Sequence, residues 1–334
     1  MKVSPALPIL LSPFSFLYGL VVTIRTWLYD QGWLKQKRLK GAVISVGNLT
    51  VGGTGKTPLV IWLAEKLLEQ GHRVAILSRG YHGTAGSSDE VELMRSRLQD
   101  RVLFGVGKNR FAEGHRVESA QAIDVFLLDD GFQHLQLARD LDIVMMDASR
   151  SIGGQALLPA GPMRERMSAL TRAGIIVFTR TEDTAGAKEA IQLLWNLPVF
   201  AASTCLLGFR QLGGEGSLLS TPELGVGPFF AFCGVGNPGA FLRDLQRWGV
   251  PLADHFFFAD HHRYTPGDVY TIEAAAAQRG AKALITTEKD FWNLSAVKFS
   301  VLPVYISIID LEVVGESEFM AAVNRELQTH GALV

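Results

Sequence analysis

The sequence predicts an α/β protein: a mostly parallel sheet with flanking helices, a smaller α/β domain after it, and a helix at a membrane surface before it. Three observations support this prediction. Beyond residue 40, short apolar runs alternate with helical patterns, a glycine-rich turn joins the first run to a helix, and residues 3–24 carry no charge. Strands separated by helical crossovers form right-handed parallel units, and the sheet they build is covered on both faces.

Composition limits the functions that this chain of 334 residues can have. Hydrophobic residues make up 48% and charged residues 19%, which excludes a disordered or collagen-like chain and leaves ample material for a packed core. The net charge is -1, so we expect no nucleic acid as a partner, and nothing in the sequence indicates an obligatory protein partner. The 2 cysteines lack a CxxC spacing, which excludes a disulfide scaffold and a four-cysteine zinc site.

The length predicts about two domains at roughly 150 residues each. Residues 206–228 are rich in Gly, Leu and Ser, as a junction between domains often is. We therefore expect four segments along the chain: a membrane-associating segment at 1–40, a nucleotide-binding domain at 41–205, the junction at 206–228, and a smaller α/β domain at 229–334.

The uncharged amino terminus favours a helix that lies in a membrane surface. Prolines at positions 5, 8 and 13 interrupt its first half, so the uninterrupted part is Phe14–Ile24. A helix of that length is about 16 Å long, well short of the ~30 Å hydrocarbon core. A full span is therefore less favoured, and a signal peptide fits badly because no small-x-small cleavage motif precedes Arg25.

Side-chain types near this segment agree with a surface position. Small or polar residues form a narrow stripe at Ser15, Gly19, Thr23 and Thr26. Interfacial aromatic residues and then a basic cluster follow, at Trp27, Tyr29, Trp33, Lys35, Lys37, Arg38 and Lys40. The mean hydropathy of +0.18 is high for a freely soluble enzyme. The alternative is a helix that packs on its own domain.

Each remaining element is predicted from its apolar pattern. Strands are expected at residues 42–46, 74–77, 125–128, 143–146 and 175–178, and in the smaller domain at 229–232, 283–286 and 304–308. A helix is expected at Pro58–Glu69, where Leu59, Leu63 and Leu67 recur at helical spacing and Pro58 suits a first turn. A further helix is expected at residues 273–279.

The strongest chemical signal is the glycine-rich turn after the first strand, VGNLTVGGTGKTP at residues 46–58. Such a turn allows backbone N–H groups and a helix N-terminus to surround phosphate oxygens, as in P-loop NTPases. Lys56 is expected on the β- and γ-phosphates and Thr57 on Mg²⁺. The usual first glycine is Thr50, and Val51 stands where a variant of this loop carries a second lysine. The nucleotide-binding residues are expected to be Thr50, Val51, Gly52, Gly53, Thr54, Gly55, Lys56 and Thr57.

A nucleotide site of this kind also needs a carboxylate at the end of an apolar strand to hold Mg²⁺. Asp129 and Asp130 follow the strand at residues 125–128, at the carboxyl edge of the sheet beside the loop. Adjacent side chains diverge, so we expect only one of them to face the metal directly. Asp147, after the strand at residues 143–146, is a weaker competitor.

Several segments together resemble one family, the tetraacyldisaccharide 4'-kinases of lipid A biosynthesis. The matching segments are VGNLTVGGTGKTP (46–58), SRGY (78–81), DDGFQH (129–134), LPAGPMRER (158–166), ADHH (259–262) and TEKD (287–290). They follow the family's order over nearly the whole chain, and Thr50 in the loop is normal for this family. The combination of DDGFQH with LPAGPMRER is specific, whereas GGTGKT alone is generic.

The resemblance implies ATP-dependent phosphorylation of the 4'-hydroxyl of a tetraacylated glucosamine disaccharide 1-phosphate, on the cytoplasmic face of the bacterial inner membrane. It implies that Asp89 accepts the hydroxyl proton and that His261 pairs with it, although the neighbouring His262 stays an alternative. Metal ligands are expected among Thr57, Glu90, Asp129 and Asp130, with Lys56 and Asp130 taking part in catalysis. Contacts with the substrate are implied for Arg79, Tyr81, Arg110, His134, Arg164 and Glu165.

Two interpretations from other classes remain open at this point. A membrane-associated ATPase or GTPase switch would share the phosphate loop. The only segment superficially similar to a guanine-reading N-K-x-D motif is residues 287–290, where Glu288 stands in place of asparagine, so guanine specificity is unsupported. A non-catalytic, nucleotide-dependent assembly factor is the other. Residues 287–290 themselves either contact nucleotide or cap a helix.

Overall fold

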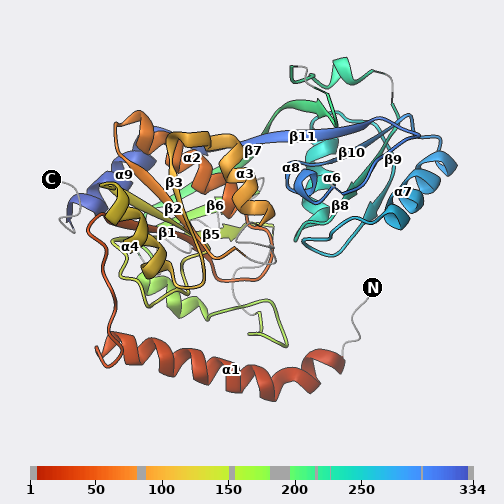
Figure 1. The fold of residues 1–334 in the computed structure, drawn as a ribbon. Coiled ribbons are helices and arrows are strands. Elements are labelled where there is room, and N and C mark those ends of the chain that lie inside the picture. The colour runs from red at the N-terminus through yellow and green to blue at the C-terminus, as the bar shows by residue number, and fades with distance from the viewer. Residues whose placement is uncertain are drawn as a thin grey trace. The chain divides into compact units, whose positions relative to one another are not determined.

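The computed structural model describes residues 6–80, 88–149, 155–180, 196–214, 217–225, 227–294 and 296–329 (Figure 1). The chain divides into two compact units. Unit 1 contains residues 1–79, 98–203 and 313–334, and unit 2 contains residues 80–97 and 204–312.

Unit 1 is built on a parallel sheet, as predicted. Its strands are β1 (Ala42–Asn48), β2 (Val74–Ser78), β3 (Leu103–Val106), β4 (Val125–Asp129), β5 (Leu141–Asp147), β6 (Ile175–Thr179) and the start of β7 (Val199–Gln211). Their order is β3-β2-β4-β1-β5-β6-β7, and the pairs from β3 to β7 are parallel. β1 therefore ends between the acidic end of β4 and the end of β5, at the carboxyl edge where ligands bind in such sheets.

Helices α2 (Lys56–Glu69), α4 (Arg110–Ala120) and α9 (Glu316–Thr329) pack on this sheet. The 14-residue α2 buries Leu59, Leu63 and Leu67 completely, which is the helical spacing that predicted it. Trp62 meets Phe319 of α9 edge to face, with ring centroids 5.5 Å apart. Short 3-10 turns occupy Gln99–Arg101 and Met167–Arg172.

Unit 2 is a smaller α/β assembly with strand order β11-β10-β8-β9. These strands are β8 (Phe229–Cys233), β9 (Leu252–Phe257), β10 (Ala283–Thr287) and β11 (Val304–Val314), and their neighbours pair in parallel. The helices are α3 (Asp89–Leu98), α6 (Pro238–Arg247), α7 (Pro266–Gln278) and α8 (Glu288–Phe291), with 3-10 turns at Pro222–Leu224 and Trp292–Leu294.

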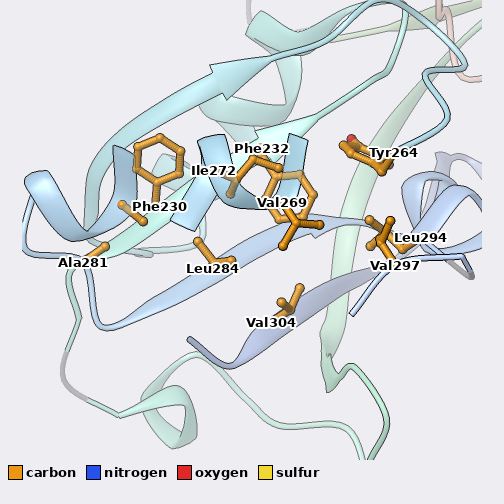
Figure 2. Close-up of a cluster of buried hydrophobic side chains, with 11 residues drawn as sticks. Phe230, Phe232, Tyr264, Val269, Ile272, Ala281, Leu284, Leu294, Val297 and Val304 are labelled. Atoms are coloured by element: carbon orange, nitrogen blue, oxygen red, sulfur yellow. The ribbon is translucent and has the colours of Figure 1, made fainter. Parts of the chain in front are cut away.

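The core of unit 2 forms where α7 covers the strands. Phe230 and Phe232 of β8 and Leu284 of β10 meet Val269 and Ile272 of α7 (Figure 2). A capping box starts α7: the Thr265 hydroxyl accepts from the Asp268 N–H, and the Asp268 carboxylate accepts from the Thr265 N–H. The helix begins earlier than the residues 273–279 that the sequence predicted.

The division into units differs from the continuous domains expected from the sequence. Residues 80–97 group with unit 2, and residues 313–334 return to unit 1 and supply α9. The segment 206–228, expected as a loose junction, begins inside the 13-residue strand β7. The chain passes between the units along β7 and β11, and neither strand has the Gly and Pro content that marks a junction in a sequence.

The amino-terminal helix α1 (Ala6–Asp30) is longer than predicted and runs through Pro13 (red in Figure 1). The expected interruption was wrong, because a proline removes one hydrogen bond and can be accommodated when the turns on either side stay intact. Residues 10–30 are long and apolar enough to cross a membrane, so the length argument against a span no longer holds. Length and composition alone do not distinguish a span from a surface helix.

Two residues of the small stripe of α1, Ser15 and Gly19, are buried against its own unit, whereas Thr23 is exposed. The Ser15 hydroxyl donates to the carbonyl of Leu157 at 2.9 Å and accepts from the N–H of Ala160 at 2.9 Å. A Cβ at Gly19 would lie 2.6 Å from the Leu157 side chain, so a larger residue there would require that side chain to shift. The large apolar side chains on the rest of the helix are exposed, namely Leu10, Phe14, Phe16, Leu17, Leu20, Val21, Ile24 and Trp27.

Candidate active site

The glycine-rich turn becomes a phosphate-type loop at the carboxyl end of β1. Gly52 and Gly55 adopt positive φ angles of 109° and 86°, a conformation that costs glycine little, and Gly55 is the N-cap of α2. Lys56 and Thr57 form the first turn of α2, at the positive end of the helix. The strand, loop and helix follow one another as the sequence predicted, with Lys56 at the start of α2.

The entrance to this loop is attached to the segment at residues 157–164. The N–H of Val51 donates to the carbonyl of Pro162 at 2.8 Å, and the N–H of Arg164 donates to the carbonyl of Leu49 at 2.7 Å. Thr50 therefore lies in a short antiparallel bridge with Met163. This pairing gives the position of the missing first glycine an extended conformation that threonine adopts readily.

Asp130 lies beside the loop, within a group of cations. Its carboxylate is 3.6 Å from the Lys56 ammonium, and the Arg164 guanidinium donates to both oxygens at 2.8 and 2.7 Å. Burial acts to raise the pKa of Asp130, but the charges of Lys56 and Arg164 outweigh it and hold the pKa below its ordinary value. The side chain is thus an anion, as a metal ligand must be.

The other two strand-end carboxylates have different surroundings. Asp129 is buried at the end of β4, 3% exposed, while the next residue, Asp130, has a positive φ that turns the chain away from the strand. Asp147, the weaker candidate from the sequence, pairs with Arg180 and accepts from the Ser149 hydroxyl at 2.6 Å.

One buried and one half-buried basic side chain lie in the same unit. Arg110, the first residue of α4, is 5% exposed, and its Nε has no hydrogen-bond partner in the described part of the chain. Burial and then the charge of Arg79 lower the pKa of Arg110 below its usual range. The Nε2 atom of His134 is also buried without a partner among the described residues. Burial first, and then Arg110 and Arg139, lower the pKa of His134 to about 4.

The remaining substrate candidates are placed differently. Arg164 is paired with Asp130, as described above. Glu165 is buried and pairs with Arg172 at 2.8 Å, and the Arg172 guanidinium lies 4.6 Å from the centre of the Phe132 ring. Tyr81 lies outside the described residues.

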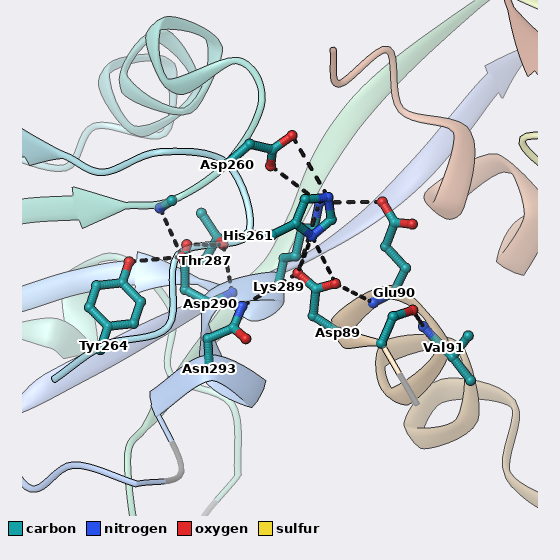
Figure 3. A network of polar contacts seen from close by, with 12 residues as sticks. Asp89, Glu90, Val91, Asp260, His261, Tyr264, Thr287, Lys289, Asp290 and Asn293 are labelled. Atoms are coloured by element: carbon teal, nitrogen blue, oxygen red, sulfur yellow. Dashed lines mark hydrogen bonds and ion pairs between the residues drawn. The ribbon is translucent and has the colours of Figure 1, made fainter. Parts of the chain in front are cut away.

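A second polar cluster, in unit 2, brings Asp89 and His261 together (Figure 3). The Nδ1 atom of His261 lies 2.9 and 3.0 Å from the two carboxylate oxygens of Asp89, across 172 residues of sequence. Burial acts to raise the pKa of Asp89, but the hydrogen bond with His261 and the charge of Lys289 keep it below its ordinary value. The hydrogen bond with Asp89 raises the pKa of His261, against the opposing effects of burial and of Lys289.

Lys289 lies at the centre of this cluster. Its ammonium is 3.3 Å from Glu90, 3.5 Å from Asp260, 4.0 Å from Asp89 and 3.4 Å from the Nε2 atom of His261. Burial acts to lower the pKa of Lys289, but these carboxylates outweigh it and raise the pKa. The result is a cation that holds three carboxylates and one imidazole in place.

One of the two alternatives for the TEKD segment, a helix cap, is present in the structure at Thr287. Thr287 caps α8, since its hydroxyl accepts from the N–H of Asp290 at 3.2 Å. Glu288 forms a two-point ion pair with Arg97. Asp290 is 1% exposed and accepts from the Gly234 N–H and the Tyr264 hydroxyl, both at 2.8 Å. Burial raises the pKa of Asp290 despite these donors.

His262, the neighbour of His261, contacts Asp268 and Phe258. The Nε2 atom of His262 lies 3.1 Å from Asp268, and its ring stacks on Phe258 with centroids 4.5 Å apart. The geometry therefore selects His261 as the partner of Asp89. His261 also has a positive φ of 59°, which marks a tight turn at this point.

Two polar residues were missed from the sequence. The Asn293 amide donates to Asp89 at 3.4 Å, and the Arg180 guanidinium donates to the carbonyl of Gly53 at 3.2 Å. Asn293 gave no signal, because an isolated asparagine after a short helix has no diagnostic spacing. Arg180 lies two positions after the strand expected at residues 175–178. Ligands bind at the carboxyl ends of such strands, so a polar residue at this position was a signal that could have identified Arg180.

Comparisons with known proteins agree with this arrangement. A family model described as Tetraacyldisaccharide-1-P 4'-kinase matches residues 7–328. The tetraacyldisaccharide 4'-kinase of Geobacter sulfurreducens is 37% identical over 329 residues, covering 93% of this chain and 91% of that protein. The one from Geobacter metallireducens is 37% identical over 338 residues, with 95% and 98% covered.

A solved structure is similar over almost the same length. It is a crystal structure of LpxK from Aquifex aeolicus in complex with ATP, which superposes with a TM-score of 0.73 at 30% sequence identity. The match covers 96% of this chain and 99% of that chain. The similarity therefore includes both units as well as α1.

Proposed function

Since the chain belongs to the tetraacyldisaccharide-1-P 4'-kinase family, it is a kinase that acts on a hydroxyl, and we propose here which of its residues perform the transfer. The reaction moves the γ-phosphate of ATP to the 4'-hydroxyl of a tetraacylated glucosamine disaccharide 1-phosphate, a lipid A precursor. In such a transfer the protein mainly positions the reactants and stabilises charge.

ATP binds at the loop between β1 and α2. The N–H of Val51 already donates to the carbonyl of Pro162, so the N–H groups of residues 52–57 surround the phosphates, and Lys56 contacts the β- and γ-phosphates. The support for this assignment is the positive φ of Gly52 and Gly55 together with the position of Lys56 at the helix start. The loop therefore supplies the nucleotide side of the reaction.

Magnesium fits the oxygen donors near the loop. The Thr57 hydroxyl and the Asp130 carboxylate, with Asp129 at the strand end, are the hard oxygen ligands that Mg²⁺ prefers. Glu90, in the cluster around Lys289, is a further candidate ligand. When bound, the cation neutralises charge on the phosphate oxygens. The low pKa of Asp130 keeps that carboxylate available as an anion at neutral pH.

Asp89 accepts the proton of the attacking 4'-hydroxyl. As the sugar oxygen bonds to the γ-phosphorus and the bridging bond to ADP breaks, the hydroxyl proton passes to the Asp89 carboxylate. His261 orients this carboxylate and, through Nδ1, stabilises its charge before the proton arrives. The single observation that carries this assignment is the 2.9 Å contact between the buried Asp89 and His261.

The acceptor carries its own phosphate, and Arg110 is the residue best suited to it. Its guanidinium is buried, carries a full charge, and has an Nε donor without a protein partner among the described residues. An arginine in this state binds phosphate oxygens strongly, because folding has already removed water from its donors. Arg79 and His134 border the same region through their electrostatic coupling to Arg110.

We propose that the exposed apolar face of α1 contacts the membrane that carries the acceptor. We assign the protein to the cytoplasmic face of the inner membrane, where ATP is available, as a peripheral or monotopic enzyme. The basic residues that follow α1 suit anionic headgroups. No nucleic acid and no obligatory protein partner enters this assignment.

The test is ATP consumption with and without the acylated disaccharide 1-phosphate. Acceptor-dependent consumption with a 4'-phosphorylated lipid product is expected. Slow hydrolysis that is indifferent to the acceptor would instead support a membrane-associated ATPase or GTPase switch. Omitting Mg²⁺ and adding a chelator should abolish product formation, and full activity under those conditions would contradict the metal assignment.

A further inference from the structure

Three side chains at the ends of two strands, β1 and β6, donate hydrogen bonds to the carbonyl groups of the nucleotide loop. The Asn48 amide donates to the carbonyl of Gly52 at 3.5 Å and to the Thr54 hydroxyl at 3.0 Å. The Arg180 guanidinium donates to the carbonyl of Gly53 at 3.2 Å. The Thr179 hydroxyl donates to the carbonyl of Thr54 at 3.3 Å.

Because these contacts fix the loop's carbonyl groups, they also fix the direction in which its N–H groups point. A peptide unit is planar and trans, so its N–H points away from its C=O. With the carbonyl of Gly53 directed at Arg180, the N–H of Thr54 points to the opposite side. With the carbonyl of Thr54 directed at Thr179, the N–H of Gly55 does the same. The two N–H groups thus point away from these outer donors, as a loop that binds phosphate requires.

The Arg180 side chain is itself fixed. Its other terminal nitrogen forms an ion pair with Asp147 at the end of β5, and Asp147 also accepts from the N–H and hydroxyl of Ser149 at 3.1 and 2.6 Å. Asp147 is buried and the Arg180 side chain is 26% exposed. A planar guanidinium with one end held in this way presents its remaining donors in a defined direction.

We propose that Arg180 and Thr179 are positioning residues for ATP, because together they orient the loop's peptide groups toward the triphosphate, with Asp147 holding Arg180. This inference rests on the proposed binding of ATP at the loop and extends it to residues that do not touch the phosphates.

The experiment compares paired substitutions in the full-length enzyme. Arg180→Met removes both the donor and the ion pair, and Arg180→Lys keeps the charge. Thr179→Val removes the hydroxyl at constant shape, and Thr179→Ser keeps it. The readouts are the Kd for ATP by calorimetry, the KM values for ATP and for the acceptor, kcat, and the thermal midpoint.

We expect Arg180→Met and Thr179→Val to weaken ATP binding by about tenfold, with a matching rise in the KM for ATP. The KM for the acceptor should stay within about twofold, since no acceptor group is assigned to these residues. Thr179→Ser should restore ATP affinity, and Arg180→Lys should restore part of it. Removing the Asp147 charge with Asp147→Asn should weaken ATP binding by less than Arg180→Met.

A matched control separates positioning from general stability. Arg73 forms an ion pair with Asp124 at the amino-terminal ends of β2 and β4, away from the loop edge of the same sheet. Arg73→Gln should leave the Kd for ATP unchanged. If Arg180→Met also leaves it unchanged, or if Arg73→Gln weakens it equally, the inference is overturned while the kinase assignment stands. If the unsubstituted enzyme fails to bind ATP, both are overturned.

Discussion

The ammonium nitrogen of Lys289 lies 3.4 Å from the Nε2 atom of His261. An ammonium group can only donate hydrogen bonds, so in the neutral ring Nε2 accepts and the proton resides on Nδ1, facing Asp89. Lys289 therefore selects the tautomer in which His261 donates to the carboxylate that we assign as the base. The same ammonium also holds Glu90 and Asp260, which ties the whole cluster to α8.

Replacing Lys289 should impair turnover without impairing ATP binding. In Lys289→Met the tautomer preference and the ties to Glu90 are lost, so kcat should fall by up to about a hundredfold. Lys289→Arg, which keeps the charge, should retain more activity. Lys298→Met, at an exposed lysine of the same unit, is the control and should behave as the unsubstituted enzyme. Equal kcat in Lys289→Met and Lys298→Met would contradict this role.

The Asp89–His261 pair gives a sharper prediction. Asp89→Asn and His261→Gln should each lower kcat by roughly 10²- to 10⁴-fold, the usual contribution of a positioned proton acceptor. The Kd for ATP, measured by calorimetry, should change little, because the loop in unit 1 is unaltered. His262→Gln is the matched control at the neighbouring position, where the ring pairs with Asp268. If His262→Gln lowered kcat more than His261→Gln, the assignment of the two histidines would be reversed.

His134 should remain neutral at physiological pH. Burial, then the charges of Arg110 and Arg139, lower its pKa to about 4, whereas an unfolded histidine titrates near 6.5. Between these values the unfolded chain binds more protons than the folded one, so the free energy of unfolding should fall as the pH is lowered from about 6.5 to 4. Proton NMR of the imidazole should give a midpoint near 4, and Arg110→Gln should raise it. A midpoint near 6.5 in the unsubstituted enzyme would show that the ring is solvated.

The exposed face of α1 should bind lipid vesicles. Phe16 is 68% exposed and Leu20 is 45% exposed, so replacing both with serine removes apolar surface without touching the protein-facing stripe. Vesicle recovery by sedimentation should weaken by at least about tenfold, because each large apolar side chain contributes roughly 1.5–3 kcal/mol on burial. Turnover on a long-chain acceptor should fall more than turnover on a short, soluble analogue. Tyr270→Ser, at a 76% exposed residue of α7, serves as the control.

Equal loss of activity on the long-chain and short acceptors would indicate that α1 has a purely structural role. The contacts of Ser15 and Tyr18 with residues 157–164 show that one face of the helix does support unit 1. The paired serine substitutions avoid these contacts, whereas deleting residues 1–30 would remove both faces at once. The double substitution is therefore the more informative variant.

The sequence predicted most of the strands and the nucleotide loop, because each depends on local patterns of apolar residues and glycine. The contact of Asp89 with His261 came from a family resemblance, since nothing local links residues that are 172 positions apart. Residues 287–290, which include Lys289, were left with two interpretations, a nucleotide contact or a helix cap, because the partners of Lys289 are also distant in the sequence. Arg164 was implied to contact the substrate, and the structure pairs it with Asp130, a choice among opposite charges that only tertiary packing decides.

Boundaries predicted from local patterns differ from those in the structure at two places. Pro13 predicted an interrupted helix, because sequence rules treat each proline by its local cost, yet α1 continues through it. Continuous domains were expected for the same reason, since composition gives no sign that residues 313–334 return to unit 1. Both differences arise where contacts between distant segments outweigh local preference.

The return of the chain to unit 1 has a consequence for biosynthesis. Phe319 of α9 is fully buried and packs edge to face on both Trp62 and Phe200. During translation, the nucleotide-binding unit therefore lacks part of its interior until residues 313–334 have emerged from the ribosome, after all of unit 2 has been made. Nascent chains arrested before that point should be sensitive to protease at α2, even though the loop and its strand were synthesised long before.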